Sequence, residues 1–289
     1  MKRILLLFSL TITSCVFSQT GDVNALMQLL NTQKEDTARV NTYLLLSKTL
    51  YKISKYEPAL ENANQAKILA EKLEYKKGIA NSLYDIGSVY FYQGKYAEAI
   101  KSHNEALKIR EDLGDKKNVA VSYIAMSHIY GMQHNYQECI KNNRAALKVM
   151  EEVNDKQGIA SCYGNMGDAY YRLNNYTDAL KNDFEALKIF EEIGYKKGVG
   201  TTYNNIGNVY RSQRFYEDAL KYHLAGLKIR EEIGDKWDIA ASMANIGKVY
   251  KEQDKMKDSK KYYKKALDMA NEIGAQDLER RIIKMMEEK

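Results

Sequence analysis

The feature that most constrains this chain is a block of five residues that recurs every 40 positions. The sequence KKGIA at 76–80 returns as KKNVA at 116–120, KQGIA at 156–160, KKGVG at 196–200 and KWDIA at 236–240. No insertion or deletion separates these copies, and a weaker copy precedes them. A unit this short cannot bury its apolar surface alone, so the repeat predicts that successive copies stack and share a continuous core.

Each copy has the pattern of two amphipathic helices joined by a short turn. In the copy that begins with KKGIA, Leu83, Ile86 and Tyr90 lie three or four positions apart, which places them on one face of a helix. The pair Gly94-Lys95 interrupts this pattern, and a second apolar stripe follows. The chain contains one proline in 289 residues, which favours long helices because proline breaks helix interiors. The sequence therefore predicts an all-α fold.

Certain residue types recur where these helices would cross. The first helix of a copy carries a small residue followed three positions later by tyrosine, and the second carries two small residues seven positions apart. This pattern resembles the tetratricopeptide repeat (TPR) family, which implies a right-handed α-solenoid of six stacked helix-turn-helix repeats. The residues that carry the resemblance are Gly87, Gly167, Gly207 and Gly247 (Ser47 and Ser127 in two copies); Tyr90, Tyr130, Tyr170, Tyr210 and Tyr250; Ala59, Ala99, Cys139, Ala179, Ala219 and Ser259; and Ala66, Ala106, Ala146, Ala186, Gly226 and Ala266.

We expect six repeats with a capping helix at each end. TPR repeats of about 34 residues usually end with a proline, but glutamates such as Glu111 and Glu151 stand at that place here. The second helix can therefore continue, which accounts for the longer period and resembles the repeats of kinesin light chain and of bacterial signalling proteins. The expected segments are a cap at 19–35, repeats at 36–75, 76–115, 116–155, 156–195, 196–235 and 236–275, and a cap at 276–289.

Residues 1–18 have the layout of a secretory signal peptide. A basic start precedes an apolar stretch, and Ser18 is a small residue at the expected cleavage site. The ending resembles signal peptides of Bacteroidetes-type bacteria, so we expect an exported protein, periplasmic or secreted, that begins at Gln19. Two alternatives stay open. The letters ITSC resemble a lipobox, which would attach a lipid to Cys15, and the apolar stretch could instead remain as an uncleaved anchor.

Charge and hydropathy narrow the class of partner. The chain has 44 Lys and Arg against 38 Asp and Glu, a formal net charge of +6 spread along the sequence. Such mild, dispersed basicity is more typical of a solvated surface than of a nucleic-acid interface. After Ser18 no apolar run approaches the roughly 18 residues that cross a bilayer. We therefore expect no nucleic-acid partner and no membrane span in the mature chain, and the oligomeric state stays open.

The sequence holds no pattern for catalysis, metal binding or cofactor binding. It lacks His-x-x-x-His and Cys-x-x-Cys spacing, a glycine-rich phosphate loop and a Gly-x-Ser-x-Gly motif. His103 and His223 occupy the same place in their repeats, which favours packing over metal binding. Cys139 and Cys162 could form a disulfide in an exported protein, but Cys139 takes the place of an alanine, which favours packing. We expect no enzyme activity, no metal and no cofactor.

The candidate binding residues lie on the first helices, which line the concave groove in TPR proteins. Asn165, Asn205 and Asn245 lie one repeat apart and would form a ladder of side-chain amides, resembling those with which TPR proteins bind extended peptides. Alternatively, these asparagines form hydrogen bonds only within the turn of the next repeat. Arg172, Arg211 and Lys248 would add a positive end suited to an acidic side chain or terminal carboxylate. The predicted peptide-binding residues are Asn81, Tyr84, Ser88, Tyr92, His128, Asn165, Asp168, Arg172, Asn204, Asn205, Asn208, Arg211, Asn245 and Lys248.

These observations favour a non-catalytic scaffold that binds a protein or peptide in the concave groove of a TPR solenoid. The first alternative is a sensory or regulatory module of a bacterial signalling system, which would act through a separate output protein. The second alternative is a structural spacer in a surface complex. An enzyme is the least favoured class.

Overall fold

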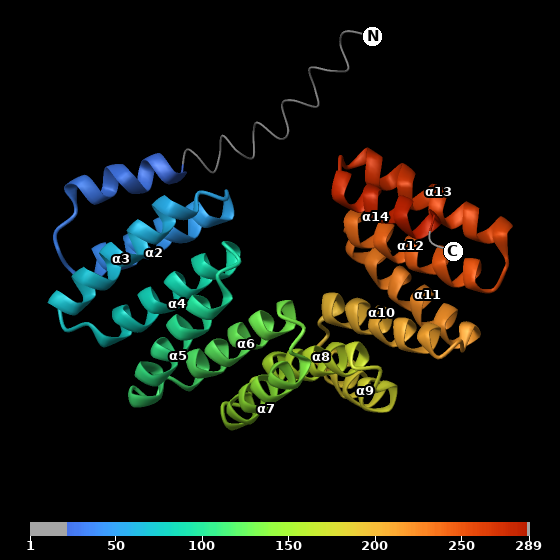
Figure 1. The fold of residues 1–289 in the computed structure, drawn as a ribbon, viewed down its shortest axis with the longest axis horizontal. Helices are drawn as coiled ribbons and strands as arrows, with labels where there is room; N and C mark the ends of the chain where they lie inside the picture. Colours follow the sequence, from blue (N-terminus) through green and yellow to red (C-terminus); the bar gives the residue numbers. More distant parts are fainter. Residues whose placement is uncertain (1–21, 288–289) are drawn as a thin grey trace, which may run out of the picture. The chain divides into compact units, whose positions relative to one another are not determined.

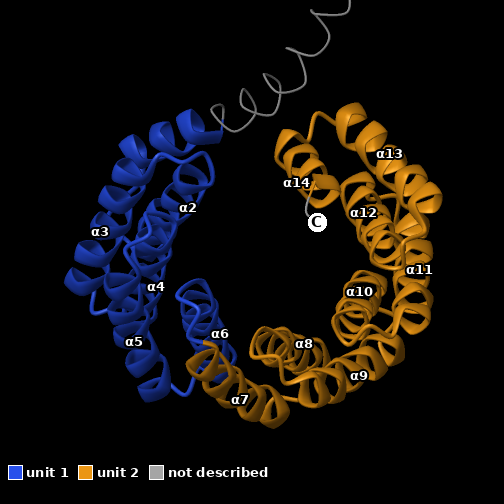
Figure 2. Cartoon of the chain, turned by 45° about the vertical axis from the view of Figure 1, so that its right-hand side comes forward, with its two compact units in different colours: residues 1–135 blue, residues 136–289 orange. Residues whose placement is uncertain are grey.

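The structure is a computed structural model that describes residues 22–287, and every regular element in that range is an α-helix (Figure 1). The expected signal peptide at 1–18, with Cys15, lies outside these residues. The helices form two compact units that divide after Asn135, inside the third expected repeat (Figure 2). Within 22–287, no helix is both long and apolar enough to cross a membrane.

The first unit begins with a short helix at 22–32 and continues with two helix pairs and a single helix. Helix α2 packs against α3 and α4, α4 packs against α5, and α5 packs against α6. The even-numbered helices form one layer and the odd-numbered helices the other (Figure 2). The helices are α2 (Thr37–Lys52), α3 (Tyr56–Lys72), α4 (Lys76–Tyr92), α5 (Tyr96–Asp112) and α6 (Lys116–Met132).

The second unit continues the same alternation of layers. Each helix from α7 to α14 packs against the next one along the chain, and α14 also packs against α12. We call the surface of the even-numbered helices in each unit the first-helix face. The helices are α7 (Tyr136–Glu152), α8 (Lys156–Arg172), α9 (Tyr176–Glu192), α10 (Lys196–Ser212), α11 (Tyr216–Ile233), α12 (Lys236–Glu252), α13 (Met256–Glu272) and α14 (Gln276–Glu287).

The turns that join the helices share one backbone conformation. A residue with positive φ recurs every 20 positions, and it is glycine at Gly94, for example. There the Gly94 N–H donates to the carbonyl of Phe91 and the Lys95 N–H donates to the carbonyl of Tyr90, both at 2.9 Å. These two bonds satisfy carbonyl groups that the end of a helix would otherwise leave without donors. The same short turn at each helix end keeps the helices in register without insertions.

Glycine in the first helix of a repeat makes room for a side chain from the second. A Cβ atom at Gly167 would lie 2.4 Å from Oδ1 of Asp183, and one at Gly207 would lie 2.8 Å from the His223 ring. A larger residue would therefore overpack these crossings, as the small residues in the sequence pattern predict. A side chain of the second helix can thus reach towards the first-helix face.

Neighbouring repeats pack through a second set of matched residues. A Cβ atom at Gly198 would lie 2.6 Å from the ring of Phe190, so glycine accommodates that bulky side chain. In the first unit, Arg110 takes the place of Phe190 and donates to Oγ of Ser122 at 2.7 Å and to the carbonyl of Asn118 at 3.1 Å. A buried guanidinium needs such partners, and the following repeat supplies them.

The terminal helices contribute apolar side chains to the core of their units. In the helix at 22–32, Val23 and Leu30 are buried with Leu46 of α2. In α14, Leu278 and Ile282 are buried in the cluster that α12 and α13 form. Each terminal helix therefore covers apolar surface of the neighbouring helices.

Candidate functional site

All the predicted binding residues lie on even-numbered helices, and each unit holds its own set. The first unit holds Asn81, Tyr84, Ser88 and Tyr92 on α4 and His128 on α6. The second unit holds Asn165, Asp168 and Arg172 on α8, Asn204, Asn205, Asn208 and Arg211 on α10, and Asn245 and Lys248 on α12.

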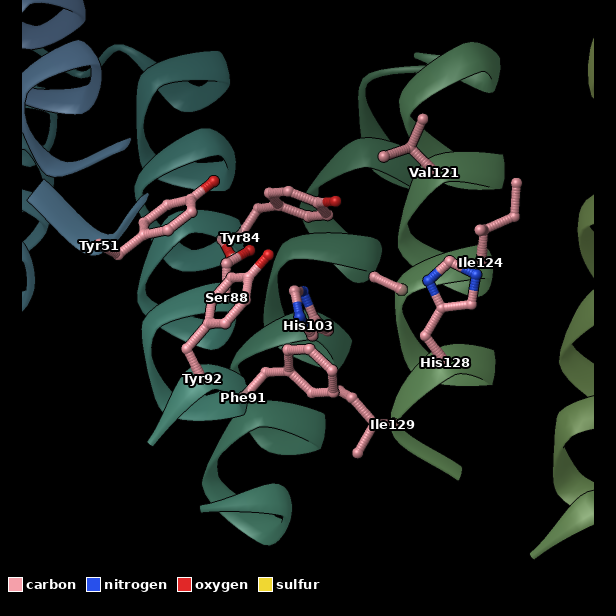
Figure 3. A pocket seen from close by; sticks show the side chains of 11 residues that line it. Tyr51, Tyr84, Ser88, Phe91, Tyr92, His103, Val121, Ile124, His128 and Ile129 are labelled. Carbon is pink, nitrogen blue, oxygen red and sulfur yellow. The ribbon is translucent and has the colours of Figure 1, made fainter. Parts of the chain in front are cut away.

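Aromatic side chains surround an open hollow of about 260 Å³ in the first unit (Figure 3). The rings of Tyr51 and Tyr92 stack with their centroids 5.2 Å apart, and Tyr92 is 53% exposed. Figure 3 shows His128 on the far side of the hollow and the ring of His103 between the two sides. Such aromatic faces with polar edges suit an apolar or planar group of a ligand. This aromatic hollow is lined by Tyr51, Tyr84, Ser88, Phe91, Tyr92, His103, Val121, Ile124, Ala125, His128 and Ile129.

A buried cation and a neutral imidazole support the aromatic hollow. The guanidinium of Arg110 lies 4.7 Å from the centre of the Tyr84 ring and donates to Oδ1 of Asn81 at 3.2 Å. His103 is buried and meets the Tyr84 ring edge-on. Burial, and to a smaller extent the nearby charge of Arg110, lower the pKa of His103 to about 4. The imidazole is therefore neutral at pH 7, and the oxygen of Asn81 is already engaged within the protein.

The three asparagines of the expected ladder make different contacts. The amide of Asn165 donates to Oδ1 of Asn143 at 3.2 Å, and that of Asn245 donates to Oδ1 of Asn204 at 2.9 Å. Asn205 instead lines a hollow between α8 and α10. Two of the three amides thus donate to side chains of the preceding repeat, and not to the turn of the next repeat that the alternative expected. Contact of these residues with a ligand stays a prediction.

The basic residues of the expected positive end have acidic neighbours. Arg211 pairs with Glu252 at 2.6 Å, and the half-exposed Arg172 lies 3.5 Å from Asp168. Lys248 and Arg211 line a wider hollow that Glu252 also lines. This end of the second unit therefore carries both signs of charge, so its attraction for a carboxylate is weaker than three isolated cations would give.

A small hollow of about 150 Å³ in the second unit has a buried carboxyl among its lining residues. Asp183 of α9 is 1% exposed, and neither of its oxygens accepts a hydrogen bond of regular geometry. Burial, and to a smaller extent the carboxylate of Asp168, raise the pKa of Asp183 to about 8. The amide of Asn205 lies close enough to lower this pKa but outside regular hydrogen-bond geometry, so burial dominates. This polar hollow is lined by Asp168, Tyr171, Arg172, Asp183, Asn205, Asn208 and Val209.

Sequence reasoning missed the contribution of the second helices to both hollows. His103 and Asp183 come from α5 and α9, but they line hollows on the first-helix face. Both occupy the repeat position of His223, opposite a glycine of the first helix. The sequence therefore held a signal for these residues, namely a polar residue of the second helix opposite a glycine of the first. Because glycine has no side chain, the polar side chain can extend past it to the first-helix face.

The described residues show no metal centre and no reactive thiol. Among residues 22–287, no three His, Cys, Asp or Glu side chains are grouped as metal ligands. Cys139 and Cys162 are both buried, and no disulfide joins them. Burial raises the pKa of Cys162 to about 12, so its nucleophilic thiolate is scarce at neutral pH. Both cysteines pack as small apolar residues.

Comparison with known proteins gives a family and several similar folds. The sequence model of the tetratricopeptide repeat family matches residues 38–112, 78–138, 118–192 and 198–272. No curated protein sequence matches the chain.

Three solved structures illustrate the similarity of fold. One is a signal-transduction ATPase with numerous domains (STAND) and a tetratricopeptide repeat sensor from Pyrococcus horikoshii, with a TM-score of 0.74 and 18% identity over 90% of this chain but 41% of that one. The second is the apo form of the quorum sensor NprR from B. thuringiensis, with a TM-score of 0.64 and 14% identity over 91% of this chain and 80% of that one. The third is a Rap protein complexed with Competence and Sporulation Factor, with a TM-score of 0.61 and 15% identity over 91% and 79%.

The family match spans most of the chain, and the helix pairs with small residues at their crossings are the structural unit of that family. This chain therefore belongs to the tetratricopeptide repeat family.

Proposed function

We propose that the protein is a non-catalytic scaffold that binds a protein or peptide on its first-helix face. One observation carries the proposal. The position that follows the small crossing residue of the first helix holds five residue types over six repeats, with lysine in the first and the last, whereas the crossing residue itself stays glycine or serine. A position that only supports the fold has no need of such variety. The variable residues are Lys48, Ser88, His128, Asp168, Asn208 and Lys248.

The geometry of the first-helix face supports ligand binding in each unit by itself. In the first unit the aromatic hollow offers flat apolar surface, and in the second unit the polar hollow offers amides and carboxyls. Two of the similar structures are a quorum sensor and a Rap protein bound to a factor, which is compatible with a ligand on a scaffold of this kind. A sensory module acting through a separate protein would use the same face, and the identity of the partner separates the two functions.

The experiment is affinity capture from a periplasmic extract with the purified protein and two double variants. The test variant is Tyr92→Ala with His128→Ala, whose side chains line the aromatic hollow. The matched control is Ile68→Ala with Lys101→Ala, two exposed residues of second helices in the same unit. We expect the wild type and the control to retain a partner that the test variant loses. Equal capture by all three proteins would contradict the proposal.

We also propose that the protein is exported after cleavage behind Ser18. The intact mass should then correspond to a chain that begins at Gln19. A diacylglyceryl adduct on Cys15 would contradict simple export and establish a lipoprotein.

A further inference from the structure

We propose that the polar hollow binds a cationic nitrogen group, an ammonium or a guanidinium, of the ligand on the first-helix face. The inference deepens the proposed function and rests on it. The sequence predicts that an acidic group of the ligand binds at Arg172, Arg211 and Lys248. The present inference instead places a positively charged group of the ligand in the polar hollow.

The carboxyl of Asp183 is the reason for this assignment. Asp183 is 1% exposed, and neither oxygen has a regular hydrogen-bond donor. Buried polar atoms in folded proteins almost always have a partner, and an isolated buried carboxylate is costly. The amide of Asn205 approaches this carboxyl outside regular hydrogen-bond geometry, so a donor that arrives with the ligand would supply a hydrogen bond that the protein does not. A guanidinium or an ammonium offers several N–H donors and the charge that complements a carboxylate.

Asn143 and Tyr263, the equivalent side chains of two other repeats, have partners within the protein. The amide of Asn143 donates to the carbonyl of Cys139, and its oxygen accepts from Asn165. The hydroxyl of Tyr263 donates to the carbonyl of Met285. The equivalent histidines each keep one buried ring nitrogen without a partner, Nδ1 of His103 and Nε2 of His223, but burial lowers the pKa of both rings, so they are neutral. Asp183 differs because both of its oxygens lack a donor and its ionised form carries a charge.

In this repeat, Gly167 lets the side chain of Asp183 reach the polar hollow. A Cβ atom at Gly167 would lie 2.4 Å from Oδ1 and 2.8 Å from Cγ of Asp183, so only glycine lets the carboxyl reach between α8 and α10. The hollow of about 150 Å³ can hold several waters or the head of one Lys or Arg side chain. Its amide groups at Asn205 and Asn208 add carbonyl oxygens that accept hydrogen bonds from a cation.

The charges that face Asp183 favour a cation at the entrance. Helix α8 contributes Asp168 and Arg172, which lie 3.5 Å apart and are both about half exposed, and α10 contributes only uncharged residues to the lining. With Asp183 ionised, the lining holds two carboxylates and one guanidinium. The net charge is negative, and the half-exposed Asp168 is the first of the two carboxylates that an entering cation meets.

Binding should release a proton from the hollow. The pKa of Asp183 is raised to about 8 by burial and by Asp168, so the empty hollow holds a protonated carboxyl at neutral pH. A bound cation favours the ionised form. Affinity should therefore fall about tenfold for each pH unit below 8, because the protonated fraction competes with the cation.

The experiment titrates ethylguanidinium into the purified protein and follows amide signals of α8 and α10 by NMR, with uncharged ethylurea as the chemical control. The variants are Asp183→Asn, which keeps the shape but removes the charge, and the matched Glu185→Gln, which removes an exposed charge from the same helix. We expect saturable shifts in the wild type and in Glu185→Gln, at least tenfold weaker binding in Asp183→Asn, and a pH dependence that this variant lacks. If Asp183→Asn fails to fold, Asp183→His replaces it, because His103 and His223 occupy that repeat position.

Three alanine-based peptides of five residues then identify the source of the cation. Two have both termini blocked and carry a central Arg or a central Lys, and the third is all alanine with a free amino terminus and a blocked carboxyl terminus. Equal binding of ethylguanidinium to the wild type and Asp183→Asn, or no saturable binding to either, would overturn the inference. The capture experiment with Tyr92 and His128 tests a different unit of the chain. The titration can therefore show that the polar hollow binds no cation while the capture experiment supports the proposed function. The opposite outcome, cation binding without capture of a partner, can be distinguished in the same way.

Discussion

At the scale of single residues, the crossing between the two helices of a repeat decides what the first-helix face presents. The first helix supplies a glycine, and the second supplies a buried polar side chain that fills the gap, as Gly207 and His223 show. His223 lies beside the oxygen of Asn204 at 2.9 Å, so the crossing also orients a predicted binding residue. The residues at this crossing therefore both pack the two helices together and hold a side chain of the first-helix face in place.

The glycine of α8 provides a test of this packing. Gly167→Ala places a methyl group 2.4 Å from Oδ1 of Asp183, so we expect a loss of about 1–3 kcal/mol in the free energy of unfolding. Gly164→Ala is the control on the same helix, because its nearest neighbour is 4.0 Å away. That control should be neutral or gain up to about 1 kcal/mol from better helix propensity. Urea denaturation measures both, and equal stability of the two variants would refute the account of the crossing.

The raised pKa values of two buried aspartates, Asp183 and Asp85, predict how the stability of the fold depends on pH. Burial raises the pKa of Asp183 to about 8 and that of Asp85 to about 7, the latter against the opposing charge of Lys48 at 3.6 Å. In the unfolded chain an aspartate ionises near pH about 3.9, so between these values the folded state binds more protons. The free energy of unfolding should fall as pH rises, by at most about 1.4 kcal/mol per pH unit for each group.

Urea denaturation at pH 5 and pH 8 checks this slope. Asp183→Asn should lose less stability between the two pH values than the wild type, whereas Glu185→Gln, which removes an exposed charge, should follow the wild type. An unchanged slope in Asp183→Asn would mean that the buried carboxyl ionises at an ordinary pH.

At the scale of elements, the sequence predicts the helix pairs well and the contacts of the face less well. The positions of Gly87 and Tyr90, with the 40-residue period, are enough to predict helix pairs and their turns, because these depend on local spacing. The partners of Asn165 and Asn245 could not be predicted, because a carboxamide finds its partner according to the distance between helices. Asp183 was missed for a different reason, because only the first helices were considered, although the glycine opposite Asp183 was a signal in the sequence.

The last helix tests the role of the terminal elements. Deleting residues 276–289 removes Leu278 and Ile282, which are buried against α12 and α13. The loss of these contacts should lower the melting temperature, and the apolar surface that the deletion exposes should promote association. Thermal unfolding and light scattering measure the two effects, and Met286→Ser, at an exposed position of the same helix, serves as the control. A truncated protein that melts like the wild type and stays monomeric would contradict the capping role.

At the scale of the whole molecule, the positions that build the repeats are distinct from the positions that differ between them. The small crossing residue of the first helix is glycine or serine in every copy, while the position that follows it changes, for example from Ser88 to Lys248. Each unit buries its own core and carries its own hollow. A scaffold of this kind can change its ligand by exchanging face residues while its fold stays the same.

The most direct test of this claim is hydroxyl-radical footprinting of the protein with and without the captured partner. The reporters on the first-helix face are Tyr92 and His128, and the reporters on second helices are Ile68 and Phe184, all of them exposed in the structure. The account predicts that the partner protects Tyr92 and His128 from oxidation and leaves Ile68 and Phe184 unchanged. Protection of Ile68 and Phe184 with unchanged oxidation of Tyr92 and His128 would contradict it.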